Sequence, residues 1–268
     1  MLKNIREALR VKLIRAVDDV IARHHAEHDQ LLRDELKQLK ADFRDQAERI
    51  VEFARAVEIR DRRDLVAAGE RAAARESAEF AREHMSGART FPDPATTMDY
   101  ALSLVGGAGM ALEFGVYTGA TLTTIARACI ERAVYGFDSF DGLPQDWRAG
   151  FPAGTFAASS TPHIAGVKIV TGLFADTLPR FLHDHPDPVA FLHLDADLYS
   201  STRTVLHLLG PRLRAGSVIV FDEYFNYPGW IDHEHRAWQE FIAQTNIRFS
   251  YEAYTHDNEQ VVVRIMEN

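Results

Sequence analysis

The stretch LEFGVYTGATLTTIAR, Leu112–Arg127, decides the fold of this chain together with VYGFDSFDGLP, Val134–Pro144. In the first stretch, a short apolar run is followed by a turn from Gly115 to Gly119 and then by apolar residues at helical spacing. This order predicts a strand, a tight loop and a helix, with a cofactor over the loop. Tyr117 stands where a dinucleotide-binding fingerprint would carry its second glycine, so the usual nicotinamide signature is absent.

An acidic residue ends the strand of the second stretch. Asp138 follows the turn by roughly 20 residues, which is where doubly wound folds place a carboxylate that accepts hydrogen bonds from ribose hydroxyls. The turn and this acid together predict a nucleoside cofactor.

Apolar runs that fit buried strands recur along the rest of the chain, and helical segments separate them. The later runs are Val167–Phe174, Pro188–Tyr199 and Gly216–Tyr224. Because alternating helices and near-continuous apolar strands are typical of a parallel sheet covered on both faces, the sequence predicts a doubly wound, mostly parallel α/β fold with Rossmann-like topology. Two further strand-like runs, near Phe249–Tyr254 and Gln260–Ile265, would add an antiparallel edge and bring the sheet to seven strands.

The first 88 residues have a different composition. No proline precedes Pro92, Gly69 is the only glycine in the first 86 residues, and Ala, Arg, Glu, Asp and Leu dominate, which predicts long helix. Apolar residues recur there with the three-four spacing of a coiled-coil seam, interrupted by Gln46. These residues are Leu36, Leu39, Phe43, Ile50, Phe53 and Val57. We expect residues 1–88 to be a helical, coiled-coil region for oligomerisation or docking, most simply in a homo-oligomer, and residues 89–268 to be the catalytic domain.

Composition narrows the class of protein. The 268 residues are 46% hydrophobic, enough for one substantial core. Cys129 is the only cysteine, so no intrachain disulfide can form and we expect a reducing cytoplasm. No apolar run reaches the ~20 residues of a membrane helix. The net charge of −9 falls almost entirely after residue 90, and such an acidic surface disfavours nucleic acid as a substrate and suits a cationic cofactor or a metal ion.

Acidic residues stand where two of the later strands end. They are Asp195, Asp197, Asp222 and Glu223. Parallel strands of a doubly wound sheet present their carboxyl ends at one crevice, so we expect these side chains to meet there. Gathered carboxylates repel one another unless a cation neutralises them, and hard oxygen ligands prefer Mg²⁺ or Ca²⁺, which predicts a divalent-metal site. The alternative for Asp197 is a cap on the helix that starts near Ser200.

The motifs E-F-G-V-Y-T-G at Glu113–Gly119 and F-D-S-F-D-G-L-P at Phe137–Pro144 resemble those of the macrocin (TylF-type) O-methyltransferases. These are class I enzymes that use S-adenosylmethionine. The resemblance extends from about Phe91 to the C-terminus and leaves the helical region outside it.

The resemblance implies roles for the acids. Asp195, Asp222 and Glu223 would hold the metal ion, and Asp197 would be the general base. Many relatives carry Asp-Asp where this chain has Asp222-Glu223, so the second of these ligands has a longer reach here.

The resemblance also implies where S-adenosylmethionine binds. Glu113 and the turn would hold the methionine end. Asp138 would contact the ribose, Ser139 beside it would also contact the cofactor, and Gly172 and Phe174 would lie near the adenine ring. The turn residues in contact with the cofactor would be Gly115, Val116, Tyr117, Thr118 and Gly119.

Three histidines are further candidates for the base. His193 stands two residues before Asp195 and therefore on the same side of the strand, although a satisfied core histidine is the alternative. His233, with His235, follows a loop close to the acids. Candidate contacts to the acceptor come from the long loop after Asp138 and from the loop before His233, namely Trp147, Arg148, Phe151, Phe156, His163, Tyr227 and Trp230.

These features predict an S-adenosylmethionine-dependent, divalent-metal-dependent O-methyltransferase that acts on a hydroxyl group of a sugar, a glycoside or a similar polyol. One alternative is a catechol-type O-methyltransferase of a small aromatic acceptor, which is expected to carry a lysine after the metal Asp, and no lysine stands near Asp195. Another is a noncatalytic coiled-coil scaffold with a vestigial cofactor pocket, against which the retained acids argue. A nicotinamide-dependent oxidoreductase is disfavoured by the missing glycine.

Overall fold

Two units make up the chain, the first ending at Ala67 and the second beginning at Ala68. The computed structural model describes residues 2–267, and the side chains of residues 2–9 and 27 are not among its described parts.

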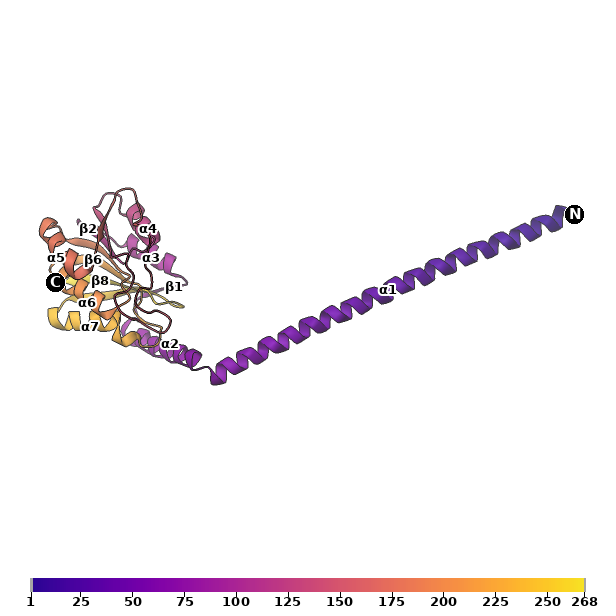
Figure 1. Cartoon of the computed structure of the whole chain (residues 1–268), viewed down its shortest axis with the longest axis horizontal. Coiled ribbons are helices and arrows are strands. Elements are labelled where there is room, and N and C mark those ends of the chain that lie inside the picture. Colours follow the sequence, from indigo (N-terminus) through magenta and orange to yellow (C-terminus); the bar gives the residue numbers. More distant parts are fainter. Residues whose placement is uncertain (1, 268) are drawn as a thin grey trace. The chain divides into compact units, whose positions relative to one another are not determined.

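The first unit consists mainly of α1, Leu2–Arg63, a single helix of 62 residues (Figure 1). The segment contains no proline or glycine, so nothing in its sequence interrupts the backbone hydrogen bonds. Ion pairs one helical turn apart lie on its surface, for example Arg49 with Asp45 at 2.9 Å. Asp64 then begins α2, Leu65–His84, by accepting hydrogen bonds from backbone N–H groups of its first turn.

An eight-stranded sheet forms the centre of the second unit, in the order β1-β7-β8-β6-β5-β2-β3-β4. The strands are β1 Arg89–Phe91, β2 Met110–Phe114, β3 Val134–Asp138, β4 Val167–Thr171, β5 Val189–Leu194, β6 Leu213–Phe221, β7 Arg248–Thr255 and β8 Val261–Glu267. Strand β8 is antiparallel to β6 and β7, and the other pairs are parallel. The predicted doubly wound, mostly parallel fold with an antiparallel hairpin is therefore confirmed.

The sheet has one strand more than the seven predicted. Strand β1 pairs in parallel with β7, with Arg89 opposite Ala253. Its three residues fall in the stretch between Gly87 and Pro92, which the sequence pattern indicates only as a break between helix and domain. A strand this short shows no periodicity, and its partner lies far along the chain, so local sequence carries no signal for it.

Helices cover both faces of the sheet (Figure 1). The helices of the second unit, besides α2, are α3 Pro94–Ser103, α4 Ala120–Ala128, α5 Phe174–Asp184, α6 Tyr199–Leu209 and α7 Glu234–Thr245, with short 3-10 turns at Gly210–Arg212 and Trp230–Asp232. Buried side chains of α3 and α4 form one apolar cluster with the sheet, and those of α2, α5, α6 and α7 form the other. None of the described helices is both long enough and apolar enough to cross a membrane.

Helix α2 packs with the sheet rather than continuing α1. Ala73 and Ala81 of α2, and Met85 directly after it, are buried in the larger apolar cluster. The Phe80 ring lies 4.9 Å from His235 and 5.6 Å from Trp230, centroid to centroid. The compact unit therefore begins about 20 residues earlier than the predicted start of the catalytic domain at residue 89, because the apolar stripe of α2 is covered by the sheet domain. The functional division into residues 1–88 and 89–268 stays a prediction.

Removing α1 alone and removing both helices are expected to have different effects on stability. A chain that begins at Asp64 keeps the core of the second unit. Its Tm should therefore equal the Tm of the second unit in the full chain. A chain that begins at Arg89 loses the buried α2 side chains, and we expect a loss of about 3 kcal/mol or more, which corresponds to a fall in Tm of roughly 6–12 °C. Calorimetry measures both. Equal Tm values for the two shortened chains would contradict the packing role of α2.

Candidate active site

The glycine turn connects β2 to α4 at the carboxyl edge of the sheet. Gly115 has φ +94° and Gly119 has φ +80°, conformations that glycine adopts without strain. A Cβ atom at Gly115 would collide with the carbonyl oxygen of Asp195. The turn therefore requires glycine for space as well as for backbone conformation, and it lies directly against the end of β5.

Asp138, the last residue of β3, holds the turn in place. Its Oδ2 accepts hydrogen bonds from the backbone N–H groups of Val116 and Tyr117, both at 2.8 Å, and its Oδ1 accepts one from Phe140 at 2.8 Å. A carboxylate offers about four acceptor positions, so roughly one remains for another donor. The residue predicted to contact a ribose is thus also a structural anchor of the turn.

A pocket of about 500 Å³ opens in front of the turn. This volume falls within the range of small-molecule sites. The predicted site residues that line it are Gly115, Tyr117, Asp138, Ser139, Gly172, Phe174, Asp195, Asp197 and Glu223, and the predicted acceptor contacts that line it are Trp147, Arg148, Phe151 and Phe156. The remaining predicted residues are not part of its lining, namely Glu113, Val116, Thr118, Gly119, His163, His193, Asp222, Tyr227, Trp230, His233 and His235.

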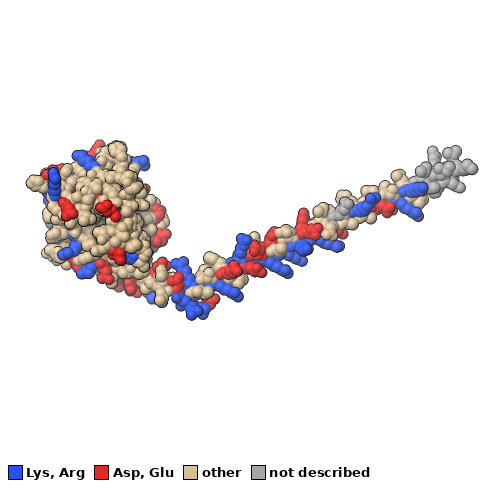
Figure 2. All heavy atoms as spheres, viewed as in Figure 1, with Lys and Arg blue, Asp and Glu red and all other residues tan. Residues whose placement is uncertain are grey.

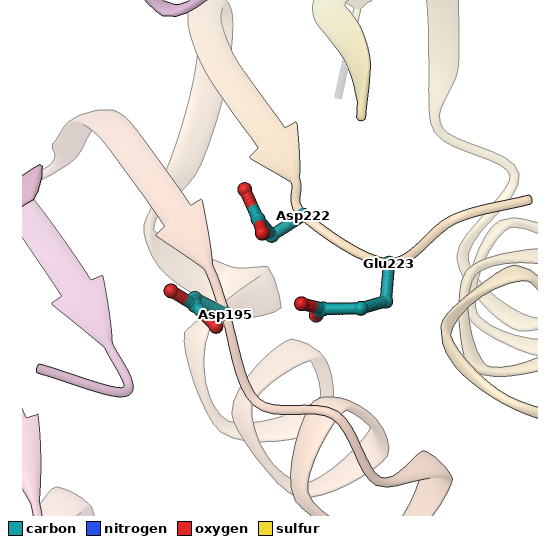
Figure 3. A group of neighbouring side chains, drawn as sticks. All are labelled: Asp195, Asp222 and Glu223. Carbon is teal, nitrogen blue, oxygen red and sulfur yellow. The ribbon is translucent and has the colours of Figure 1, made fainter. Parts of the chain in front are cut away.

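Three carboxylates converge at the end of β5 and β6 (Figure 3). Asp195 directly follows β5, and Asp222 and Glu223 directly follow β6, so the neighbouring parallel strands deliver them to one place. One oxygen from each of the three lies within 4.8 Å of the others. Glu223 Oε2 is buried and has no hydrogen-bond partner within residues 2–267. A buried carboxylate oxygen without a donor indicates a position for a ligand or an ion.

Burial and mutual repulsion change the ionisation of these acids. Burial raises the pKa of Glu223 well above its ordinary value, and the charges of Asp222 and Asp195 raise it further. The pKa of Asp195 is likewise raised well above its usual range, first by burial and then by Asp222. In the absence of a cation, Asp195 and Glu223 therefore bind a proton more readily than exposed carboxylates do.

His193 lies behind the cluster, between two acids. It is 1% exposed, its Nδ1 lies 2.9 Å from Glu113 Oε1, and its Nε2 lies 3.4 Å from Asp222 Oδ1. Burial by itself lowers the pKa of His193, but the interactions with Asp222 and Glu113 outweigh it and raise the pKa well above its ordinary value. Burial would likewise raise the pKa of Asp222, yet His193 lowers it below its usual range. The pair keeps Asp222 ionised.

Asp197 faces the pocket in a left-handed backbone conformation, with φ +56°. Such a conformation costs a non-glycine residue of order 1–3 kcal/mol and is most often found at functional sites. Burial raises the pKa of Asp197 to about 7, although Arg148 acts in the opposite direction. The alternative that Asp197 caps the following helix is wrong, because the cap residue of α6 is Leu198 and no side chain makes a capping hydrogen bond there.

His233 and His235 lie among aromatic rings. The His233 ring centroid is 5.9 Å from that of Tyr227 and 6.4 Å from that of Trp147. Burial lowers the pKa of His233, and it lowers that of His235 to about 4. Both imidazoles are therefore neutral at physiological pH, and their use as a base stays a prediction.

Two further acids support the site and were not predicted from the sequence. Glu234, the first residue of α7, is fully buried and accepts a hydrogen bond from the backbone N–H of Glu223 at 3.0 Å. Glu259 pairs with Arg148 at 2.8 Å. An acid in the first turn of a helix is usually a solvated partner of the helix dipole, so nothing in the local sequence predicts that Glu234 is buried.

Comparison with known proteins adds an independent line of support. Residues 112–224 match the family described as a methyltransferase domain. This part of the chain is therefore similar to a methyltransferase domain. The match begins in β2, includes the glycine turn and ends just after Glu223, so it covers the candidate site. It confirms the enzyme class predicted from the motifs.

Individual proteins similar to this chain are also methyltransferases. Demethyldecarbamoylnovobiocin O-methyltransferase of Streptomyces niveus is 29% identical over 156 residues, which are 48% of this chain and 58% of the relative. The chain thus spans less than two thirds of the length of that relative. The crystal structure of CalS11, a calicheamicin methyltransferase, is 25% identical with a TM-score of 0.53 and covers 63% of this chain and 77% of CalS11.

A further structure shows the same fold. The O-methyltransferase NovP is 24% identical, with a TM-score of 0.50, over 64% of this chain and 80% of NovP. Together with CalS11 and the Streptomyces relative, it confirms the resemblance to O-methyltransferases that the two motifs indicated.

Replacing Asp138 should loosen the glycine turn. Asp138→Ala leaves three backbone N–H groups without their charged acceptor, and we expect a loss of about 2 kcal/mol in the free energy of unfolding. Ser139→Ala is the matched control, because the Ser139 hydroxyl accepts only one bond, from Asp141 N–H at 3.2 Å. The urea unfolding midpoints of the two variants measure the difference. Equal midpoints would show that Asp138 does not anchor the turn.

Proposed function

We propose that this chain is an S-adenosylmethionine-dependent, divalent-metal-dependent O-methyltransferase that acts on a hydroxyl group of a sugar, a glycoside or a similar polyol. One observation carries the proposal: Asp195, Asp222 and Glu223 form one cluster, and two of its members, Asp195 and Glu223, line the same pocket as Gly115 of the glycine turn and Asp138. A cation site and a nucleoside site therefore share one cavity. That juxtaposition suits a reaction in which a donor and an activated hydroxyl must approach each other.

The cofactor side of the pocket has the features that S-adenosylmethionine requires. Gly115 and Asp138 both line the pocket, and the Asp138 carboxylate keeps an acceptor position for a ribose hydroxyl. Phe174 and Gly172 line the adjoining wall, where an adenine ring would pack. Val116, Thr118 and Gly119 belong to the turn without lining the pocket, and Glu113, in the strand before it, is buried.

Asp195, Asp222 and Glu223 would hold the metal ion. The donor set fits, because three carboxylates are hard oxygen ligands of the kind that Mg²⁺ and Ca²⁺ prefer. The unpartnered buried oxygen of Glu223 fits as well, since a cation would satisfy it. When bound, a divalent cation lowers the pKa of a coordinated hydroxyl group and orients it. The longer Glu223 side chain reaches the other two carboxylates in this structure, so the Asp-to-Glu change does not remove it from the cluster.

Asp197 is the proposed general base. It lines the pocket, and its raised pKa of about 7 is close to the value at which a base is most effective at neutral pH. Asp197 would take the proton of the acceptor hydroxyl as the oxygen attacks the methyl carbon and the carbon–sulfur bond breaks, leaving a neutral thioether. His193 would act indirectly, by holding Asp222 in its ionised form.

The relatives favour a sugar acceptor. The Streptomyces relative acts on demethyldecarbamoylnovobiocin, and CalS11 is described in a second structure as a TDP-rhamnose 3'-O-methyltransferase. In this chain, Trp147, Phe151 and Phe156 line the acceptor side of the pocket beside Ser200 and Thr204. Aromatic faces and hydroxyl groups in one wall can pack against a sugar ring and bond to its hydroxyls.

Methyl transfer should depend on the metal and on its ligands. With radiolabelled S-adenosylmethionine and a panel of glycosylated natural products and saccharides, we expect activity to be lost in chelator and restored by Mg²⁺. Asp195→Asn and Asp222→Asn should each lower kcat/KM by roughly 10²-fold or more, since each removes a charged ligand. The matched control is Asp257→Asn, an exposed aspartate in the β7–β8 turn. Full activity of the wild-type chain in chelator would refute the metal role.

Replacing Asp197 should remove catalysis without removing cofactor binding. Asp197→Asn keeps the shape of the side chain but cannot take a proton, so we expect kcat to fall by roughly 10²- to 10⁴-fold. Its affinity for S-adenosylmethionine, measured by calorimetry, should match that of the wild-type chain. A variant that keeps its kcat would assign proton removal to another group, and the same assay on His233→Gln would then identify or exclude His233.

A further inference from the structure

Helix α1 carries a long apolar stripe, interrupted only at Gln46. Among the described residues of the first unit, no other segment covers this stripe. The side chains of Leu32, Leu36, Leu39, Phe43, Ile50, Phe53 and Val57 are between 50 and 72% exposed. Figure 2 shows uncharged surface along α1 interspersed with both basic and acidic side chains. Exposed apolar residues that form one helical stripe are characteristic of a surface that binds another protein.

The spacing of the stripe is that of a coiled coil. From residue 32 to residue 57 the intervals alternate between four and three, so Leu36, Phe43, Ile50 and Val57 occupy a positions. Leu32, Leu39, Gln46 and Phe53 occupy the d positions. The seam spans about 39 Å of helix. We propose that it is covered by the same seam of a second copy of this chain, in a parallel, in-register, two-stranded coiled coil.

Gln46 favours the parallel over the antiparallel orientation of the two helices. In a parallel pair each d residue lies opposite the same d residue of the other copy, so two Gln46 amides meet and can hydrogen bond to each other. In an antiparallel pair a positions lie opposite d positions, and Gln46 would face an apolar side chain such as Phe43. A buried amide without a partner is unfavourable, so the antiparallel arrangement is disfavoured.

The flanking charges agree with this orientation. In a parallel pair each g residue lies near the e residue five positions later in the other copy. Glu35 at g then approaches Lys40 at e, which gives two attractive pairs per dimer. The next two such pairs combine Asp42 with Ala47 and Arg49 with Ala54, so no like charges oppose each other.

The a and d residues favour two strands. Two of the four a positions, Ile50 and Val57, are β-branched, and two of the four d positions, Leu32 and Leu39, are leucines, which is the combination that prefers a dimer. Since α1 precedes the methyltransferase domain in both copies, a parallel pair attaches the two domains at the same end of the coiled coil. This inference does not depend on the proposed methyl transfer.

The mass of the full chain in solution tests the pairing. Sedimentation equilibrium of the wild-type chain should give twice the chain mass of 30.2 kDa. Leu39→Glu places a charge in the seam and should shift the equilibrium to the monomer. Ala41→Glu adds the same charge on the outer face, at an f position, and should remain dimeric. A monomeric wild-type chain, a higher oligomer, or an equal effect of both variants would overturn the proposal.

Cross-linking tests the orientation while keeping Gln46. With oxidised glutathione as the oxidant, Leu32→Cys should form a disulfide between copies, because the parallel register places position 32 opposite itself. Ala41→Cys, on the outer face, should not. The native Cys129 is buried and does not compete. Dimers in which Leu32→Cys cross-links no better than Ala41→Cys would refute the parallel register.

Discussion

The candidate site depends on the repulsion among carboxylates that the sheet brings to one edge. Asp195, Asp222 and Glu223 have oxygens within 4.8 Å of one another, and burial raises the pKa of two of them. Such a cluster is stable only if protons or a cation reduce its charge. The fold also contains groups that keep negative charge in the cluster, because His193 lowers the pKa of Asp222. Keeping carboxylates ionised close together lowers the stability of the fold, and such an arrangement is typical of a site that binds a ligand.

The same edge of the sheet holds the glycine turn, and one contact connects the turn to the acid cluster while another connects it to the end of β3. The Gly115 backbone lies against the Asp195 carbonyl, and Asp138 accepts hydrogen bonds from the turn. A change in the position of the turn would therefore displace the end of β5. The residues proposed to bind the nucleoside and those proposed to bind the metal are therefore held in a fixed position relative to each other. A transfer reaction between two bound groups requires such fixed positions.

The outer supports of the site come from distant parts of the chain. Glu234 at the start of α7 accepts a hydrogen bond from Glu223 N–H, and Glu259 in the β7–β8 turn pairs with Arg148 in the long loop after β3. Helix α2 adds Phe80 to the aromatic rings around Trp230 and His235. These contacts fix the loops that carry the acids and the acceptor wall. The candidate site is therefore supported by parts of the second unit that lie outside its motifs.

The sequence by itself determined the alternation of strands and helices, the glycine turn, the acids at the ends of β5 and β6, and the apolar seam of α1. Each of these is local or periodic: a turn requires glycine, a buried strand requires an apolar run, and the ends of parallel strands meet by topology. Only the tertiary structure decided that β1 joins the sheet, that α2 packs on it, that Asp138 anchors the turn, and that His193 lies between Glu113 and Asp222. These depend on side chains far apart in sequence coming together in a close-packed interior, and no spacing along a single segment encodes which of them will meet.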